Sequence, residues 1–427
     1  MEKKDKYRES DFELMAPVGS YESLQAAIHA GADSVYFGIS KLNMRSGSAA
    51  NFGWDDLSQI TSICREAGVK SYLTLNTILY DDDLALMREI IDRAKESEVS
   101  AIIASDVAAM TYAAERGVAV HLSTQLNITN AEALSFYARF ADVVVLAREL
   151  NLDQVSAIHR AIEEQPIQGP NGRPVRIEMF AHGALCMAVS GKCYLSLHEL
   201  GRSANRGACG QVCRRSYRVF DETSDIELKV ENSNIMSPKD LKTVHFINKM
   251  MDAGVRVFKI EGRARGPEYV HTVVSVYKEA IRAVCNGTYS PEKIAEWDER
   301  LATVFNRGFW NGYYLGQRLG EWTPIYGSAA TREKVFVGKI TNYFSKLGVA
   351  EVLLEAGSLA QGDRIIITGP TTGLVEEDLA EIRLDLKPVA EAPKGSVISI
   401  PVPEKVRPND RVYRFNERQN TQQSFNQ

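Results

Sequence analysis

Two patterns of apolar residues alternate along the first two thirds of the chain. Short apolar runs are separated by segments in which apolar residues recur every three or four positions, a pattern typical of strands alternating with amphipathic helices. At four places a helical segment ends in glycine and passes directly into an apolar run: Gly31, Gly68, Gly117 and Gly254. Glycine just past a helix accepts the left-handed conformation that ends it.

Eight apolar runs predict strands buried on both faces. They lie at 13–18, 34–38, 71–76, 101–105, 120–125, 143–146, 176–181 and 256–260. Eight strand–helix repeats predict an α/β fold, a closed TIM-like (β/α)8 barrel. A doubly wound open sheet is the alternative, but no G-x-G-x-x-G turn follows the first strand. The capping signal Ser237-Pro238-Lys239-Asp240 predicts the start of the helix before the eighth strand.

About fifty residues between the seventh strand and this capping signal break the alternation. They predict an insertion at about 183–236, on the C-terminal face where barrel enzymes place their chemistry, with a hairpin at 217–230. From 331 to 415, short strands separated by turns predict a small all-β barrel domain. We therefore expect a catalytic domain at 1–330, a second domain at 331–415, and a disordered polar tail at 416–427.

The composition is that of an ordinary globular protein. The chain has 427 residues, 44% of them hydrophobic, and a net charge of −5. No apolar run approaches the ~20 residues of a membrane span, and no signal peptide precedes the first strand, so we expect a cytoplasmic protein. The negative total argues against indiscriminate coating of nucleic acid but leaves room for a local basic surface.

Four of the six cysteines lie within the insertion. Cys186, Cys193, Cys209 and Cys213 are spaced C-x6-C-x15-C-x3-C in glycine-rich surroundings. Cysteines in the cytosol stay reduced, so a cluster of them indicates metal binding or catalysis. The spacing fits the C-x2–4-C pairs of zinc sites poorly, and chance clustering of structural cysteines is the remaining alternative. We favour an iron–sulfur cluster.

Basic residues are concentrated in the same insertion. Between Cys186 and Arg218 there are six basic residues and one acidic residue. This excess predicts a surface for RNA phosphates, with Arg214, Arg215 and Arg218 as candidate contacts. The alternative is a solvated loop whose arginines only offset the charge of thiolate ligands.

Polar residues follow several of the predicted strands. Side chains at the C-terminal ends of barrel strands converge on one pocket, and several arginines there suit an anionic small molecule, most naturally a carboxylate. The candidate substrate-binding residues are Arg45, Asn76, Gln125, Arg148 and Arg263, and the candidate catalytic residues are His182, Lys259 and Glu261. Any one of these charges could instead belong to a structural ion pair.

Several of these segments resemble the U32 family of collagenase-like peptidases. The most specific are EMFAHGALC at 178–186 and GKCYLS at 191–196, and the similarity extends to LMAPVG at 14–19, GADSVY at 31–36, REL at 148–150 and KIEGR at 259–263. The β-rich C-terminal region resembles the extra barrel of one branch of this family.

That branch, despite the peptidase name, hydroxylates tRNA wobble uridine to 5-hydroxyuridine. The resemblance implies a [4Fe–4S] cluster on the four cysteines and prephenate as the hydroxyl source. The expected partners are therefore tRNA and prephenate, with no membrane. Other members hydroxylate a cytidine of 23S rRNA.

A peptidase and a non-catalytic RNA-binding module are the competing interpretations. The chain has no G-x-S-x-G motif, and its nearest approach to H-E-x-x-H, starting at His198-Glu199, ends in Arg202. Cys186 and His182 could form a nucleophile–base pair, but their spacing alone fixes no geometry.

Overall fold

A closed parallel barrel forms the first unit of the computed structural model, which describes residues 7–39, 41–47, 51–218, 220–221, 226–227 and 234–418. Eight strands pair in sequence order, and the last also pairs with the first, which closes the cylinder. The strands are β1 (Glu13–Pro17), β2 (Ser34–Phe37), β3 (Lys70–Leu75), β4 (Ala101–Ala104), β5 (Val120–Leu122), β6 (Val143–Val145), β7 (Arg176–Gly183) and β11 (Val255–Ile260). The predicted barrel and all eight of its strands are confirmed.

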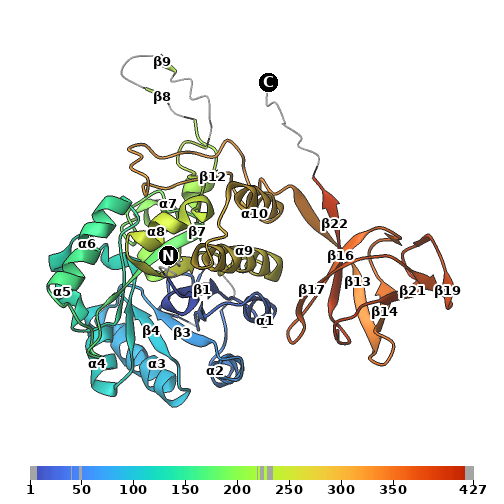
Figure 1. Cartoon of the computed structure of the whole chain (residues 1–427), viewed down its shortest axis with the longest axis horizontal. Helices are drawn as coiled ribbons and strands as arrows, with labels where there is room; N and C mark the ends of the chain where they lie inside the picture. The colour runs from blue at the N-terminus through green and yellow to red at the C-terminus, as the bar shows by residue number, and fades with distance from the viewer. Residues whose placement is uncertain are drawn as a thin grey trace, which may run out of the picture.

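Helices surround the barrel (Figure 1). They are α1 (Tyr21–His29), α2 (Asp56–Glu66), α3 (Leu84–Glu96), α4 (Val107–Arg116), α5 (Ala131–Ala138), α6 (Leu152–Glu164), α8 (Ile247–Asp252), α9 (Pro267–Cys285) and α10 (Pro291–Thr303). The four predicted helix-ending glycines all have φ between 69° and 97°, as a left-handed helix end requires. Among the described residues, no helix combines the length and apolarity needed to cross a membrane.

The starts of the strands are filled by a buried ion cluster. Glu13 is 2% exposed, and its carboxylate accepts from Lys70 Nζ at 2.8 Å, Arg176 Nη1 at 2.9 Å and the Tyr72 hydroxyl at 2.6 Å. Burial alone would raise the pKa of the Glu13 carboxyl, but the two cations lower it to about 2. This end of the barrel is therefore a packed structural plug.

The insertion after β7 carries α7 (Leu195–Leu200) and two 3-10 turns, Ala204–Arg206 and Val212–Arg214. Strands β8 (Phe220–Asp221) and β9 (Ile226–Glu227) pair antiparallel, which confirms the predicted hairpin at the residues described. The rest of the predicted hairpin, at 219, 222–225 and 228–230, lies outside the described residues.

The predicted helix start at Ser237 is wrong. Strand β10 (Asp240–Lys242) lies there instead, antiparallel to β7 and parallel to β12 (Phe309–Trp310), and α8 begins only at Ile247. The Ser237 hydroxyl accepts from Arg214 Nη1 at 3.1 Å, so a long-range contact replaces the expected cap. A local signal could not reveal this competitor.

The second unit is an antiparallel sheet with its own apolar core. Its main sheet has the order β17-β16-β22-β13-β14-β21-β18-β19, and β15 pairs with β20 beside it. The strands are β13 (Arg332–Phe344), β14 (Val349–Leu354), β15 (Leu359–Ala360), β16 (Arg364–Gly369), β17 (Gly373–Asp378), β18 (Arg383–Leu384), β19 (Lys387–Pro388), β20 (Glu391–Ala392), β21 (Val397–Pro401) and β22 (Arg411–Glu417). The all-β character predicted from the sequence is confirmed.

The two units meet where α1 packs on β17 (Figure 1). Ala26 of α1 shares a small buried cluster with Ile366 and Leu374 of the sheet. Strand β22 continues to Glu417, beyond the predicted start of the tail, because it pairs with β13 through Arg332↔Glu417. Residues 419–427 of the predicted tail lie outside the described part of the chain.

Candidate active site

A cavity of about 250 Å³ opens at the C-terminal end of the barrel, under the cysteine insertion. Its walls combine strand ends, the loop after β2 and the insertion itself. The described lining residues include four cysteines, seven cationic side chains and one carboxylate, Glu261. The insertion predicted at this face therefore forms part of the wall, as a barrel enzyme requires.

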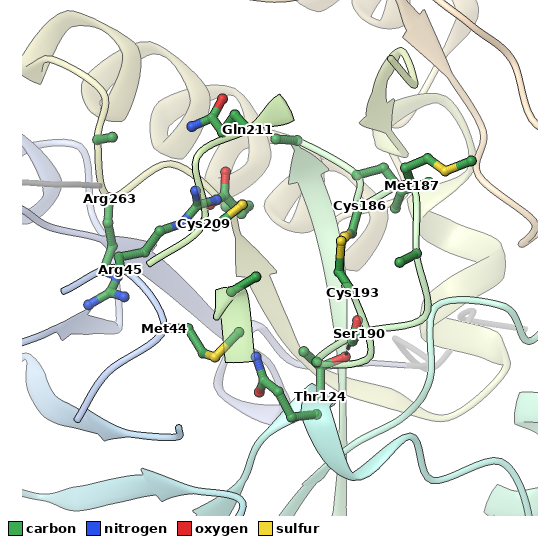
Figure 2. A pocket seen from close by; sticks show the side chains of 18 of the residues that line it. Met44, Arg45, Thr124, Cys186, Met187, Ser190, Cys193, Cys209, Gln211 and Arg263 are labelled. Carbon is green, nitrogen blue, oxygen red and sulfur yellow. Dashed lines mark hydrogen bonds and ion pairs between the residues drawn. The ribbon is translucent and has the colours of Figure 1, made fainter. Parts of the chain in front are cut away.

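The four cysteines share the cavity without forming a compact cluster. All are free; Cys186 is exposed, and Cys193, Cys209 and Cys213 are partly buried. Figure 2 shows the sulfur atoms of Cys186 and Cys193 pointing toward one another, with Cys209 beside Arg45. Within the described residues, no three His, Cys, Asp or Glu side chains are grouped closely enough to hold a metal ion.

The chemistry of the donor set fits a thiolate-bound cluster. Four thiols line the cavity, whereas no histidine or aspartate is among its described lining residues. Burial raises the pKa of the Cys213 thiol, and the other three cysteines raise it further, against the opposing charge of Arg214. Ligation of one cluster by all four thiols requires their side chains to approach one another.

Positive charge dominates the rest of the wall. Lysine and arginine side chains come from every side of the cavity: Arg45, Arg148, Arg214, Lys259, Arg263, Arg265 and Arg307. Among the described residues, carboxylates form ion pairs with only three of them: Arg45–Glu261 (2.6 Å), Lys259–Glu178 (2.9 Å) and Arg307–Asp240 (3.4 Å). The unbalanced cations favour an anionic ligand.

Arg45 and Glu261 form the central ion pair. Burial would raise the pKa of the Glu261 carboxyl, but Arg45 and Arg265 lower it, so this carboxylate stays ionised at neutral pH. The loop that carries Arg45 is fixed to the insertion because Gly47 N donates to Gly207 O at 2.9 Å. Gly207 has φ +87°, and any side chain there would collide with the Arg45 loop.

Arg148 and Arg263 have no carboxylate partner in the part of the chain that the structure describes. The Arg148 guanidinium lies 4.1 Å from the centre of the Phe180 ring and donates one hydrogen bond, to Ala184 O at 3.3 Å. Its buried Nε has no partner among the described residues. Arg263 donates to the neutral oxygens of Thr74 and Asn43, both at 3.1 Å, and burial lowers its pKa to about 10. The Arg263 guanidinium therefore remains charged at neutral pH.

Asn76 and Gln125 line the cavity, and their amides also hold its loops together. Asn76 Oδ1 accepts from Met44 N at 3.2 Å, and Asn76 Nδ2 donates to Ser123 Oγ at 3.1 Å. Gln125 Oε1 accepts from the same serine hydroxyl. The two predicted binding residues therefore lie where expected, with part of their hydrogen-bonding capacity already used.

The comparisons with known proteins agree with this architecture. The model of peptidase family U32 matches residues 19–324. The chain belongs to peptidase family U32.

Several U32 relatives have curated names. A protein of Porphyromonas gingivalis named Collagenase is 70% identical over 96% of this chain and 99% of its own length. The tRNA hydroxylation protein P1 of Bacillus subtilis is 32% identical over 84% of this chain and 83% of its own length. The 23S rRNA 5-hydroxycytidine C2501 synthase of Escherichia coli is 35% identical over 64% of this chain, but over only 39% of its own length.

The expectation that His182 lies in the cavity of this U32 chain is wrong. A register shift between β7 and β11 places Phe180 opposite Lys259 but His182 opposite Ile260, which packs in the outer core. The bulge turns His182 out of the barrel interior. Its Nδ1 lies 3.3 Å from the Tyr277 hydroxyl, and burial lowers its pKa to about 3. It is a buried neutral histidine with no access to the cavity cysteines.

Arg214 also differs from its sequence-based interpretation. Its guanidinium donates to Leu185 O at 2.7 Å, Pro238 O at 2.5 Å and Ser237 Oγ at 3.1 Å. It therefore connects the start of the insertion to its end. Arg215 and Arg218 are exposed and remain available to a partner.

Arg307 and Gln211 are among the residues of the U32 cavity that sequence reasoning did not single out. Arg307 follows α10 in a stretch without a strand or helix pattern, so only its pairing with Asp240 reveals its position. Gln211 lines the wall between Cys209 and Cys213 with φ +50°. Its position between two cysteines was the only available signal.

Proposed function

We propose that this U32 chain is an RNA-modifying enzyme that hydroxylates a tRNA wobble uridine to 5-hydroxyuridine, with prephenate as the hydroxyl source. One observation carries the proposal: the four cysteines and the unbalanced cations line the same cavity, under an insertion with exposed basic residues. The Bacillus subtilis relative named tRNA hydroxylation protein P1 supports the choice of reaction.

The cavity's cations suit a dicarboxylate such as prephenate. Arg148 and Arg263 form no ion pair with any described carboxylate and can each donate charged hydrogen bonds to a ligand carboxylate. Glu261, kept ionised by Arg45, can accept a proton from a ligand but cannot donate one at neutral pH. Lys259 Nζ lies 2.9 Å from the buried Glu178 carboxylate at the wall of the same cavity.

Cys186, Cys193, Cys209 and Cys213 would hold a [4Fe–4S] cluster. When bound, the cluster supplies electron-transfer chemistry at the roof of the cavity. The neighbouring cations, Arg214 above all, offset the negative charge that thiolate ligands bring. The protein's own task is to hold the anion and the RNA base within reach of this group.

A collagenase-like peptidase is the second candidate. The 70% identical relative carries the name Collagenase, and by identity alone the comparisons favour this candidate over the hydroxylase. The geometry argues in the other direction, because no histidine or aspartate lines the described cavity as a base for a cysteine or serine nucleophile. His182, the sequence candidate for that base, lies in the core.

Nucleoside mass spectrometry of total tRNA and rRNA from a strain lacking the gene tests the proposal. We expect 5-hydroxyuridine and its derivatives to disappear from tRNA and to return with the wild-type gene, but not with Cys186→Ala. Cys64→Ala is the matched control, because Cys64 is a buried residue of α2 in the outer core and does not line the cavity.

The same strains and the purified protein separate the candidates. Loss of 5-hydroxycytidine from 23S rRNA with intact tRNA would move the reaction to rRNA. Cleavage of denatured collagen by anaerobically purified protein, abolished in Cys186→Ala and accompanied by unchanged nucleosides, would establish the peptidase instead.

A further inference from the structure

A tyrosine stands exposed at the edge of the cavity. Tyr194 lies between Cys193 and Leu195, which both line the cavity, and it is 75% exposed. Its backbone forms the N-cap of α7, so the residue is anchored at a helix start. Among the described residues, no hydrogen bond or ring contact engages its side chain. An exposed aromatic ring beside a functional cavity is a ready surface for a flat ligand.

A second exposed aromatic ring, on the loop after β3, is held in a stacked pair with an arginine of the insertion. The Arg206 guanidinium lies 4.0 Å from the centre of the Tyr80 ring, and Tyr80 is 60% exposed. Asp83 fixes the guanidinium through contacts of 2.6 and 3.2 Å. The neighbouring Asn205 lines the cavity, and its carbonyl accepts from Ile78 N at 3.1 Å. The loop after β3 and the insertion therefore hold this pair at the cavity's edge.

The surface around these rings carries unpaired positive charge. Four exposed basic residues of the insertion make no ion pair among the described residues: Lys192, Arg202, Arg215 and Arg218. Arg206 differs from them because Asp83 neutralises it. The positive surface can attract phosphates, whereas the rings offer flat apolar faces.

We propose that Tyr194 and the Tyr80–Arg206 pair form a platform on which unpaired RNA bases stack at the mouth of the cavity. This proposal rests on the proposed function and names how the RNA is recognised. Bases in a double helix are already stacked on each other, whereas bases in a loop can stack on aromatic rings and guanidinium planes. An acidic protein would use the charges but would gain nothing specific from two exposed aromatic faces.

The test is the binding of a short fluorescent RNA, single-stranded or annealed to its complement, to the holo-protein at fixed salt. Tyr194→Ala should weaken single-stranded binding about 5- to 150-fold, the range for loss of one stacked base. Tyr194→Phe keeps the ring and should stay within about twofold of wild type. Phe136→Ala is the control, because it removes an exposed ring from α5 on the outer wall of the barrel.

Salt dependence supplies a second, independent measurement. Stacking releases no counterions, so Tyr194→Ala should leave the slope of log affinity against log salt unchanged. Arg215→Ala should instead reduce that slope by about 0.7 for single-stranded RNA. The two substitutions thus separate base stacking from phosphate attraction.

Several results would overturn the platform. These are equal binding by Tyr194→Ala and Phe136→Ala, equal loss in Tyr194→Phe and Tyr194→Ala, or duplex RNA bound as tightly as single strands. If the wild-type protein modifies RNA but Tyr194→Ala binds it normally, the platform alone is refuted. If the wild-type holo-protein binds no RNA, both the platform and the proposed function fail.

Discussion

Arg214→Ala and Arg215→Ala should affect different properties of the protein, although the two arginines are neighbours in the sequence. Arg214 donates three hydrogen bonds that join the start of the insertion at Leu185 to its end at Ser237 and Pro238. Arg215 is exposed and has no ion pair among the described residues. Removing Arg214 should therefore loosen the insertion, whereas removing Arg215 should weaken only the binding of RNA.

The contacts set the size of the first effect. Hydrogen bonds to charged groups contribute about 1.5–3 kcal/mol each, but water can replace the guanidinium at partly exposed carbonyls. We therefore expect a loss of roughly 3 kcal/mol in the local opening free energy, which corresponds to about 150-fold faster amide exchange.

Hydrogen exchange of the cysteine insertion, with iron assayed in the same samples, measures this loss. Arg214→Ala should exchange faster across 186–214 and lose iron, while the protein that retains iron keeps its salt slope for RNA. Arg215→Ala should leave the exchange rates and the iron content unchanged. Its slope of log RNA affinity against log salt should become shallower by about 0.7. A flattened slope with full iron and normal exchange in Arg214→Ala would refute this reasoning and place Arg214 on the RNA.

Three further predictions concern the cluster on the cysteines, the binding of prephenate and the stability of the fold at low pH. Anaerobically purified protein should contain about four irons and four sulfides, which Cys186→Ala loses and Cys64→Ala keeps; stoichiometric zinc without sulfide would exclude the cluster. Arg148→Ala should weaken the binding of prephenate by roughly 1.5–3 kcal/mol without changing the iron content. Unchanged activity at limiting prephenate would place the anion elsewhere. The pKa of Glu13 is lowered to about 2 in the folded state, so its ion pairs stabilise the fold above pH 4.5, and this stability is lost as the pH falls toward 2. Glu13→Gln should remove this part of the acid unfolding profile, at most about 3 kcal/mol, and an unchanged profile would contradict the assignment.

Much of the fold could be predicted because its signals are local. Apolar runs such as Val143–Val145 are buried on both faces, and glycines such as Gly117 end their helices in the left-handed conformation. Each signal depends on a residue and its sequence neighbours, so one chain is enough to recognise it. Strand β17 carries a weaker local signal, because its acidic end, at Glu376–Asp378, breaks the apolar pattern that marks a strand.

The sequence also predicted that several candidate site residues share one cavity. Residues at the ends of barrel strands must converge, so Arg148, Lys259 and Glu261 could be assigned to one cavity before the structure was known. The cysteines could be added because an insertion after β7 has to emerge at the same face.

Only the tertiary structure determined the directions in which particular side chains point. A one-residue register shift between β7 and β11 turned His182 into the core, and contacts across the insertion turned Arg214 inward and replaced the expected helix at Ser237 with β10. These outcomes depend on hydrogen bonds between residues far apart in the chain. Local periodicity determines which elements form, whereas the competition among distant donors and acceptors determines where each polar side chain points.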